Sequence, residues 1–396
     1  MKIVQKSLDE LGYVGRGKSK FRPRDSIHLY EGPYPFVQTS DVKNSGLYIT
    51  EYTQTYSEEG LAQSKLWKAG TLCITVAANI ADTSILSFDA CFPDSIIGFI
   101  PDKKKADARY IKYLFDSVMQ QSFKNFSQGA TQDNLSKEKL LSLKLSIAEN
   151  IVDQKNIADQ LDVYDNMIYN NVQRIQLLEK SAKLLFREWF IYFRYPGYKK
   201  INSEKGIPVG WERENLENHV NFKRGVEPGS KNYLETQEID AHPFYRVSDL
   251  INRKPEIFVD ELCIKKSLLQ KEDIVVSFDG SVGIVSIGLE GCYSTAIRKL
   301  EIKNKRINRA FLFCLMKSYH IQGIIKAYAK GTTIQHASES IKHMKPVLPT
   351  QNLMDEFGKI VDPMISQILN LYDQNYKLTQ ARDLLLPKLM SGKIKV

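Results

Sequence analysis

The chain has 396 residues, more than one ordinary hydrophobic core supports, which indicates two domains with connecting segments. Hydrophobic residues make up 43% and charged residues 26%, proportions typical of a globular protein and unlike those of a disordered chain. The formal net charge of +9 favours an anionic partner. Nucleic acid comes ahead of a membrane surface, because no segment is both basic and strongly amphipathic.

The cysteines and histidines place further bounds on the class of protein. The five cysteines include no Cys-x-x-Cys pair, so we interpret them as buried thiols in a reducing cytoplasm. The six histidines lack ligand spacing, and no metal site is predicted. The polar N-terminus and the lack of a long apolar run predict neither a signal peptide nor a membrane span.

Residues 1–149 are predicted to form a first globular α/β (α+β) domain. Strand-like runs at 35–39, 72–77 and 95–100 alternate with turns rich in Gly, Pro, Asn and Asp. Residues 106–121 have the spacing of an amphipathic helix.

Residues 150–190 are predicted to form one long helix. Its apolar positions alternate in steps of four and three from Ile157 to Trp189, the spacing of a coiled-coil seam, with Asn171 as the polar exception. At about 1.5 Å per residue this stretch would be roughly 50 Å long. The residues expected to pair in this seam are Ile157, Leu161, Ile168, Ile175, Leu178 and Leu185.

A turn-rich linker at 191–210 leads to a second globular domain at 211–351 and a closing helix at 352–396. Residues 308–328 are predicted as the helix corresponding to 106–121. The closing helix carries a second seam, interrupted by Asn375 and Arg382, and Pro387 is expected to end or kink it. Its pairing residues are Met364, Ile368, Leu371, Leu378 and Leu385.

The two halves are an internal repeat. Arg16-Gly17 and Arg224-Gly225 are 208 residues apart, as are the Pro-Phe steps at 35 and 243. Later matches, including Cys91 with Cys292 and the FSQGAT and YAKGTT runs, keep their order while the offset falls to about 201. A seam alone could equally pack on a globular body or join two copies of the chain. The repeat favours an intramolecular, antiparallel pair of helices.

Residues 12–24 allow two interpretations. GYVGRGKS at 12–19 fits the phosphate-loop pattern, but the buried strand before it and the helix after it are missing, which disfavours ATP binding. A basic loop that neutralises DNA phosphates explains the residues better, although a solvated run of charges stays possible. The basic side chains are Arg16, Lys18, Lys20, Arg22 and Arg24, followed in the second half by Lys223 and Arg224.

Polar residues recur at matched places after the strands of both halves, where the frame repeats while the side chains differ. This is the pattern expected if each half reads a different base sequence. Asp41 and Asp249 also recur, and we interpret them as braces of a turn. The candidate base-reading residues are Gln38, Thr39, Ser40, Asn79, Gln128, Thr131, Arg246, Ser248, Ser281, Lys330, Thr332 and Thr333.

Several longer motifs are similar to those of a known family. LLFREWFIYFRYPG at 184–197, GIPVGW at 206–211, the doubled Gly-x-Thr loops and RDLLLPKLMSG at 382–392 resemble the specificity subunit of type I restriction-modification systems. The resemblance covers nearly the whole chain. It implies a prokaryotic, cytoplasmic protein with two target recognition domains separated by two long antiparallel coiled-coil helices, related by a pseudo-two-fold internal repeat.

The resemblance also implies partners. Each domain would grip the major groove of double-stranded DNA at one half of a bipartite, asymmetric site. The helices would dock two methyltransferase subunits, with nuclease and translocase subunits joining the complex. S-adenosylmethionine, ATP and Mg would then belong to the partners, and this chain would be non-catalytic. Arg382 departs from an apolar seam.

Two other classes of protein stay open at this point. One is a self-contained methyltransferase or nuclease, which the residues disfavour because no Asn-Pro-Pro-aromatic motif, cofactor loop or carboxylate pair with an acidic-x-Lys partner is found. The other is a coiled-coil assembly protein that makes no contact with DNA.

Overall fold

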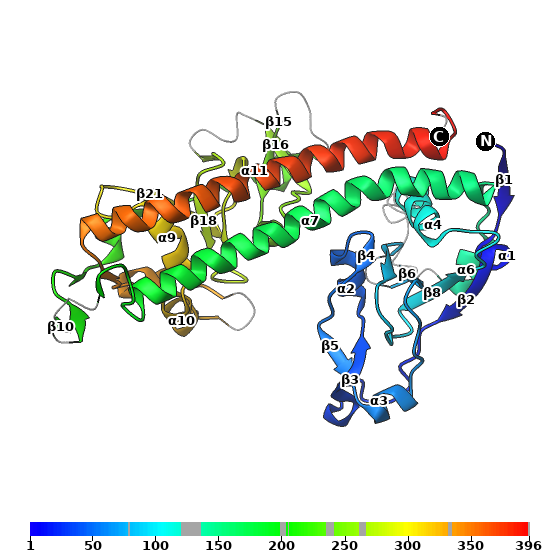
Figure 1. The fold of residues 1–396 in the computed structure, drawn as a ribbon, viewed down its shortest axis with the longest axis horizontal. Coiled ribbons are helices and arrows are strands. Elements are labelled where there is room, and N and C mark those ends of the chain that lie inside the picture. The colour runs from blue at the N-terminus through cyan, green and yellow to red at the C-terminus, as the bar shows by residue number, and fades with distance from the viewer. Residues whose placement is uncertain are drawn as a thin grey trace. The chain divides into compact units, whose positions relative to one another are not determined.

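The structure is a computed structural model that describes residues 1–77, 80–119, 136–198, 203–204, 206–234, 241–260, 267–331 and 335–394. It contains two compact units, which we call unit 1 (residues 1–170 and 375–396) and unit 2 (residues 171–374). Two helices of 40 residues each, α7 (Ile151–Phe190) and α11 (Gln351–Met390), contribute one part to each unit (Figure 1).

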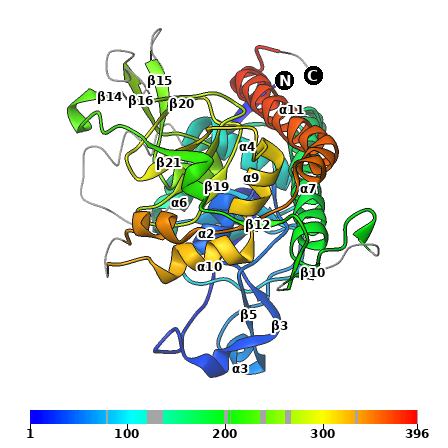
Figure 2. The same ribbon diagram turned by 90° about the vertical axis from the view of Figure 1, so that its left-hand side faces the viewer.

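Unit 1 is built around a five-stranded sheet with the order β2-β8-β6-β7-β4. The β3–β5 ribbon and α3 lie away from the part of α7 that belongs to this unit (Figures 1 and 2). Its elements are β1 (Ile3–Lys6), α1 (Leu8–Leu11), β2 (Gly12–Arg16), η1 (Ile27–Leu29), β3 (Tyr30–Phe36), α2 (Thr39–Asn44), β4 (Tyr48–Ile49), β5 (Gln54–Tyr56), α3 (Glu58–Ala62), β6 (Leu72–Thr75), β7 (Thr83–Leu86), β8 (Ile96–Pro101), α4 (Ala108–Leu114), the π-helical turn η2 (Phe115–Met119), α6 (Lys137–Ser142) and β9 (Leu145–Ala148).

Unit 2 contains a four-stranded sheet, β13-β21-β18-β19, and a five-stranded sheet, β14-β16-β15-β20-β17 (Figure 2). Its elements are β10 (Ser203–Glu204), β11 (Ile207–Pro208), β12 (Glu212–Arg213), η4 (Leu216–Asn218), β13 (Val220–Arg224), η5 (Ser230–Asn232), β14 (Tyr233–Leu234), β15 (Ala241–Tyr245), α8 (Asp249–Asn252), β16 (Ile257–Asp260), β17 (Leu268–Leu269), β18 (Ile274–Ser277), β19 (Val285–Ser286), β20 (Gly291–Tyr293), β21 (Ile297–Ile302), α9 (Arg309–Met316), α10 (Tyr319–Ala327), η7 (Ser338–His343) and β22 (Val347–Leu348).

The central strand of unit 1 is buried on both faces, which explains its continuous small and apolar sequence. Leu72 and Ile74 of β6 belong to the core that includes Tyr110 of α4 and residues of α7. Cys73 points to the other face and packs in a separate cluster with Trp67. In unit 2 all four residues of β18 are buried in the same way.

The predicted internal repeat is confirmed at the level of strand register. In unit 1 Ile97 of β8 pairs with Arg16 of β2 on one side and with Ile74 of β6 on the other. In unit 2 Arg298 of β21 pairs in the same way with Arg224 of β13 and Val276 of β18. The corresponding residues are 208 (Arg16 and Arg224), 202 (Ile74 and Val276) and 201 (Ile97 and Arg298) positions apart, so the drift in offset arises in the loops between the strands.

The two long helices pair antiparallel in each unit, because residues near the start of α7 meet residues near the end of α11. Ile157 and Leu161 share the unit 1 core with Leu386 and Leu389. In unit 2 Ile175 packs with Ile368 and Leu371, and Leu178 borders the same cluster. Of the other residues expected in the seam, Leu385 packs against the unit 1 core, Leu185 and Met364 pack against the larger core of unit 2, and Ile168 and Leu378 are half-buried.

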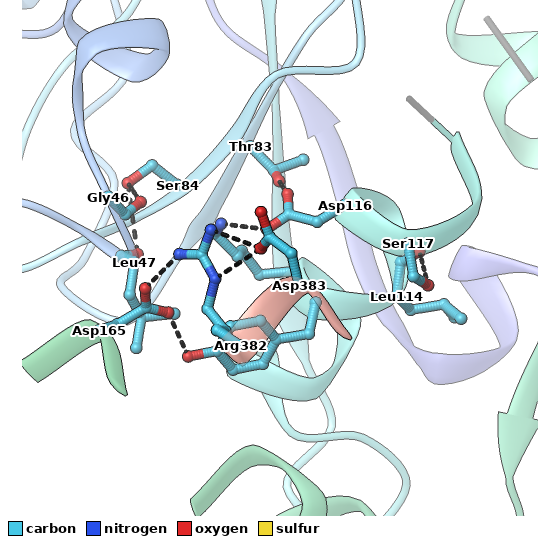
Figure 3. Close-up of polar contacts among 12 residues, drawn as sticks. Gly46, Leu47, Thr83, Ser84, Leu114, Asp116, Ser117, Asp165, Arg382 and Asp383 are labelled. Atoms are coloured by element: carbon cyan, nitrogen blue, oxygen red, sulfur yellow. Dashed lines mark hydrogen bonds and ion pairs between the residues drawn. The ribbon is translucent and has the colours of Figure 1, made fainter. Parts of the chain in front are cut away.

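Arg382 joins the seam through a buried ion pair (Figure 3). Its Nη1 lies 2.5 Å from Oδ1 of Asp165 on α7, and Oδ2 of Asp165 accepts a hydrogen bond from the Tyr113 hydroxyl at 2.5 Å. Burial disfavours the charged guanidinium, but Asp165 and Asp383 outweigh this effect and raise the pKa of Arg382 above its ordinary value. A polar residue in an apolar seam is thereby explained.

Tyr113, Asp165 and Arg382 form a polar triad in unit 1. At the corresponding positions of the repeat, unit 2 has an apolar cluster. The residues aligned with Tyr113, Asp165 and Arg382 are Cys314, Ile365 and Ala182, each buried in the unit 2 core. The Cys314 thiol lies 3.8 Å from the carbonyl oxygen of Ala182. The two halves of the helix pair therefore have the same plan and different chemistry.

Two predicted helix bounds were wrong, and of the two outcomes expected at Pro387 the structure excludes one. The expected helix at 308–328 is two helices, α9 and α10, because the Ser318 hydroxyl accepts a hydrogen bond from the Ile321 amide and starts a new helix. Pro387 does not end α11. The helix continues through this exposed residue to Met390, since water can bind the carbonyl that the proline leaves unbonded. It stops short of the predicted 396 at a turn in which Gly392 has φ +70°.

Candidate nucleic-acid interface

Five cationic side chains lie at alternate positions from Arg16, the last residue of β2, to Arg24, and all five are exposed. Lys18, Lys20 and Arg22 form no ion pair with any residue that the structure describes, so their charges are available to an anion. Arg24 is neutralised by Asp94, whose Oδ1 lies 2.9 Å from its Nη2. The Nε of Arg16 donates to the backbone carbonyl of Asp94 at 2.5 Å.

The backbone of this basic segment is fixed although its side chains face solvent. The Lys18 carbonyl accepts a hydrogen bond from the Ser64 hydroxyl at 2.8 Å. The amides of Lys20 and Phe21 both donate to Oε1 of Gln63, at 2.5 and 3.1 Å. A segment that is held in this way presents its cations at set positions, which reduces the conformational entropy cost of binding.

The phosphate-loop interpretation of residues 12–19 is wrong. Residues 12–16 form strand β2, and the loop that would wrap a nucleotide is absent from this stretch. The Gly17 amide donates to the Ile96 carbonyl at 2.9 Å and the Lys18 amide to the Phe92 carbonyl at 3.1 Å. Because both amides are already bonded, they cannot cradle phosphates.

Unit 2 repeats the arginine of this site. The Nε of Arg224 donates to the Thr295 carbonyl at 3.2 Å, as that of Arg16 does to Asp94. The glycine that follows each arginine is required by close packing, because a Cβ at Gly17 or Gly225 would lie 2.2 Å from a carbonyl oxygen. Lys223 is partly neutralised, with its Nζ 3.2 Å from Oε1 of Glu301.

The polar residues at 38–40 and 246–248 follow β3 and β15. Asp41 accepts a hydrogen bond from the Gln38 amide at 2.8 Å, and Asp249 accepts one from the Arg246 amide at the same distance. The prediction that both aspartates brace a turn is confirmed. Side chains here are partly committed within their own units: Gln38 donates to Gln54, Arg246 lies near Asp249 and Glu256, Ser248 donates to Asp249, and Thr39 and Ser40 lie in α2.

Two loops of unit 2 that are far apart in sequence lie together. The Gly280 amide donates to the Gln335 carbonyl at 2.9 Å. This contact places the exposed Ser281 beside the segment that holds Lys330, whose Nζ is 2.9 Å from Oε2 of Glu339. The remaining candidates, Asn79, Gln128, Thr131, Thr332 and Thr333, lie outside the described residues.

The structure adds residues that the sequence patterns did not single out. His336 and Asp279 are joined by a 2.7 Å contact, and Asp279 lies 3.8 Å from Nη2 of the buried Arg298. No sequence signal links positions 57 residues apart, so only the fold could reveal this group. In unit 1, Asp94 is a residue that the sequence patterns likewise did not single out. Its backbone carbonyl binds Arg16 and its carboxylate binds Arg24.

The described part of the chain contains no group of three or more His, Cys, Asp or Glu side chains that could hold a metal ion. Nor is any helix within it long and apolar enough to cross a membrane. The features that recur in both units are the arginines at the strand ends and the polar loops.

Two copies of one α/β frame, each with an arginine at the end of an edge strand and polar loops nearby, define a duplicated recognition protein carried on two long helices. A family model described as the type I restriction modification DNA specificity domain matches residues 2–180 and 208–382. The chain belongs to this family, the specificity subunits of type I restriction-modification systems. Such subunits are not themselves the enzyme, and the prediction of a non-catalytic chain is confirmed on that basis.

Named relatives match along most of the chain. The MjaIX specificity subunit of Methanocaldococcus jannaschii is 27% identical over 412 residues, covering 99% of this chain and 93% of the relative. The HindI specificity subunit of Haemophilus influenzae is 22% identical over 339 residues, covering 68% and 72%. The crystal structure of the type I S subunit from M. genitalium matches with a TM-score of 0.53 at 19% identity, covers 98% of this chain and 96% of that one, and has the same fold.

Proposed function

We propose that the chain recognises a bipartite, asymmetric site in double-stranded DNA, with one half-site read by each unit. The observation that carries this proposal is the pair of turns at Gln38 and Arg246. Their amides make the same 2.8 Å bond to an aspartate, while their side chains are chemically different. A common frame with unlike side chains suits two readers of different base sequences.

Affinity and discrimination come from different groups in this proposal. Lys18, Lys20 and Arg22 contact phosphates and supply salt-sensitive, sequence-independent binding. The polar loops supply discrimination of about 1 to 3 kcal/mol for each good base contact. Helices α7 and α11, each about 60 Å long at 1.5 Å per residue, fix the spacing between the half-sites.

Exchange of residues 1–149 for the corresponding part of another specificity subunit tests the bipartite site. In cells that also carry the methyltransferase partner, one half of the methylated motif should change and the other half should stay the same. A change in both halves would contradict separate reading by the two units. Binding of DNA that is unaffected by Ala at Lys18, Lys20, Arg22 and Arg224 would instead favour an assembly protein without DNA contact.

We further propose that the long helices dock two methyltransferase subunits, and that nuclease and translocase subunits join this complex in the prokaryotic cytoplasm. Support comes from exposed apolar side chains on α7, where Val163 and Met167 are one helical turn apart and about half exposed. Val163→Glu with Met167→Glu should abolish co-purification of the methyltransferase. Tyr319→Glu, at an exposed residue of α10, is the matched control.

A further inference from the structure

His336 is an exposed residue that is held by a largely covered partner, Asp279. Its side chain is 65% exposed, whereas that of Asp279 is only 17% exposed. Oδ1 of Asp279 lies 2.7 Å from Nδ1 of the histidine. The other carboxylate oxygen faces the guanidinium of Arg298, whose side chain is 9% exposed, at 3.8 Å. An exposed side chain gains little stability from being oriented, so this arrangement points to a use for the ring.

The backbone around this group is fixed on both sides. Lys330 and His336 exchange two backbone hydrogen bonds, at 3.0 and 2.8 Å. The next amide, of the buried Ala337, donates to the Phe278 carbonyl at 2.7 Å, and the Gly280 amide donates to Gln335. The ring therefore has a defined position relative to Asp279 and to the frame of unit 2.

The contact with Asp279 also sets the chemistry of the ring. An ionised carboxylate only accepts hydrogen bonds, so Nδ1 must carry the proton. In the neutral imidazole the other nitrogen, Nε2, is then an acceptor. No residue that the structure describes bonds to Nε2, which leaves a fixed acceptor on an exposed edge.

The backbone segment that holds Asp279 also holds Arg224. The Thr295 carbonyl accepts from Nε of Arg224, and the following carbonyl, of Ala296, accepts from the Asp279 amide at 3.3 Å. Arg298 also donates to the Thr295 carbonyl at 2.5 Å. The backbone at residues 295–296 thus helps to position Arg224, a cation suited to phosphate, and Asp279, which orients the His336 ring. The Nε2 acceptor of that ring would be repelled by phosphate.

We propose that His336 is a specificity-determining residue of unit 2. Its Nε2 accepts a hydrogen bond from the exocyclic amino group of adenine or cytosine in the major groove, where these amino groups are the available donors. Asp279 is the positioning residue that holds the proton of the neutral ring on Nδ1, which leaves Nε2 as the acceptor. This inference rests on the proposed DNA recognition and names a residue and a base class within it.

The test uses the full chain assembled with its methyltransferase and a DNA library randomised at each base pair of the site. His336→Ala should reduce the preference for adenine or cytosine about ten-fold at one base pair, the change expected on removal of one hydrogen bond. Preferences in the other half-site should not change. His320→Ala, at an exposed histidine of α10, is the matched control and should leave every preference unchanged.

The variant Asp279→Asn tests the protonation pattern of the His336 ring while the ring itself stays in place. An asparagine amide can donate to Nδ1 and so place the proton on Nε2, which turns the acceptor into a donor. The preference should then shift toward guanine or thymine at the same base pair, with overall affinity retained. A merely structural role would lower affinity for all sequences alike.

Outcomes of this experiment are distinguishable from failure of the proposed function. If the wild-type complex selects no sequence, DNA recognition by this chain is refuted. If the wild-type complex is selective and His336→Ala has the same preferences at every position, the assignment of His336 is refuted. A loss of preference at the same base pair on His320→Ala would also overturn it.

Discussion

Nη1 of Arg382 lies 2.5 Å from Oδ1 of Asp165, across the interface between α11 and α7. The carboxylate is 7% exposed, so removal of Arg382 leaves a buried carboxylate with no cation, and removal of Asp165 leaves the guanidinium with only the more exposed Asp383. Arg382→Ala or Asp165→Ala should destabilise the chain by about 3 kcal/mol in urea unfolding. The combination Asp165→Ile with Arg382→Ala copies the residues of unit 2 and should cost much less than either single change. Equal costs for single and double variants would contradict the ion pair.

Tyr113 should make stability depend on alkaline pH. Burial, and then the neighbouring negative charge of Asp165, raise the pKa of Tyr113 in the folded chain. Above about pH 10 the unfolded chain loses this proton while the folded chain keeps it, so stability falls as pH rises. The free energy of unfolding of the wild type should therefore fall faster than that of Tyr113→Phe, by at most about 1.4 kcal/mol per pH unit. Parallel curves for the two proteins would rule out this role.

The braced turns should contribute equally in the two halves. Asp41 and Asp249 are both buried, and each accepts one backbone amide bond of 2.8 Å. Asp41→Ala and Asp249→Ala should each lower stability by about 1 to 2 kcal/mol in thermal unfolding. Replacement by Asn, which keeps an acceptor oxygen, should lower it less.

The basic segment should govern the salt dependence of DNA binding. Lys18→Ala with Lys20→Ala should lessen the slope of log affinity against log salt by about 0.9 for each phosphate that is no longer neutralised. Lys103→Ala with Lys104→Ala removes the same charge beyond the other end of the β2–β8 pair and serves as the control. Equal effects of the two pairs in a binding titration would show that only net charge matters.

The buried thiols should resist alkylation. Burial raises the pKa of the Cys314 thiol to about 12 and that of Cys73 also well above its ordinary value. At pH 8 both are protonated and enclosed in the folded chain, and iodoacetamide should label them only after unfolding. Peptide mapping of labelled and denatured samples measures this difference. Rapid labelling of Cys314 in the folded chain would refute its burial.

Patterns with a long period were predictable from the sequence, and contacts between distant loops were not. The alternating steps of four and three residues were sufficient to predict helices α7 and α11, because this spacing places the apolar side chains on one buried stripe. The sequence offsets between the two halves were sufficient to predict which strands of unit 1 correspond to which strands of unit 2. The break at Ser318 was missed because apolar spacing continues through it while a hydroxyl cap restarts the helix.

The candidate site was predictable only in part. Alternate basic residues after β2 face solvent as their spacing indicates, because an extended chain places every second side chain on one side. Sequence reasoning could not foresee that Asp94 would neutralise Arg24, or that Glu301 and Glu339 would pair with Lys223 and Lys330. These partners come from other strands and loops, and their approach depends on the fold.

The triad of Tyr113, Asp165 and Arg382 also bears on synthesis by the ribosome. Asp165 is translated 217 residues before the arginine that neutralises it. If two nascent chains on one messenger joined through their α7 helices, the repeat would set Asp165 against Ala182 and enclose a carboxylate with no cation, at a cost of several kcal/mol. Pairing of α7 helices from two nascent chains is therefore disfavoured. Helix α7 of each chain pairs instead with α11 of the same chain once α11 has been synthesised.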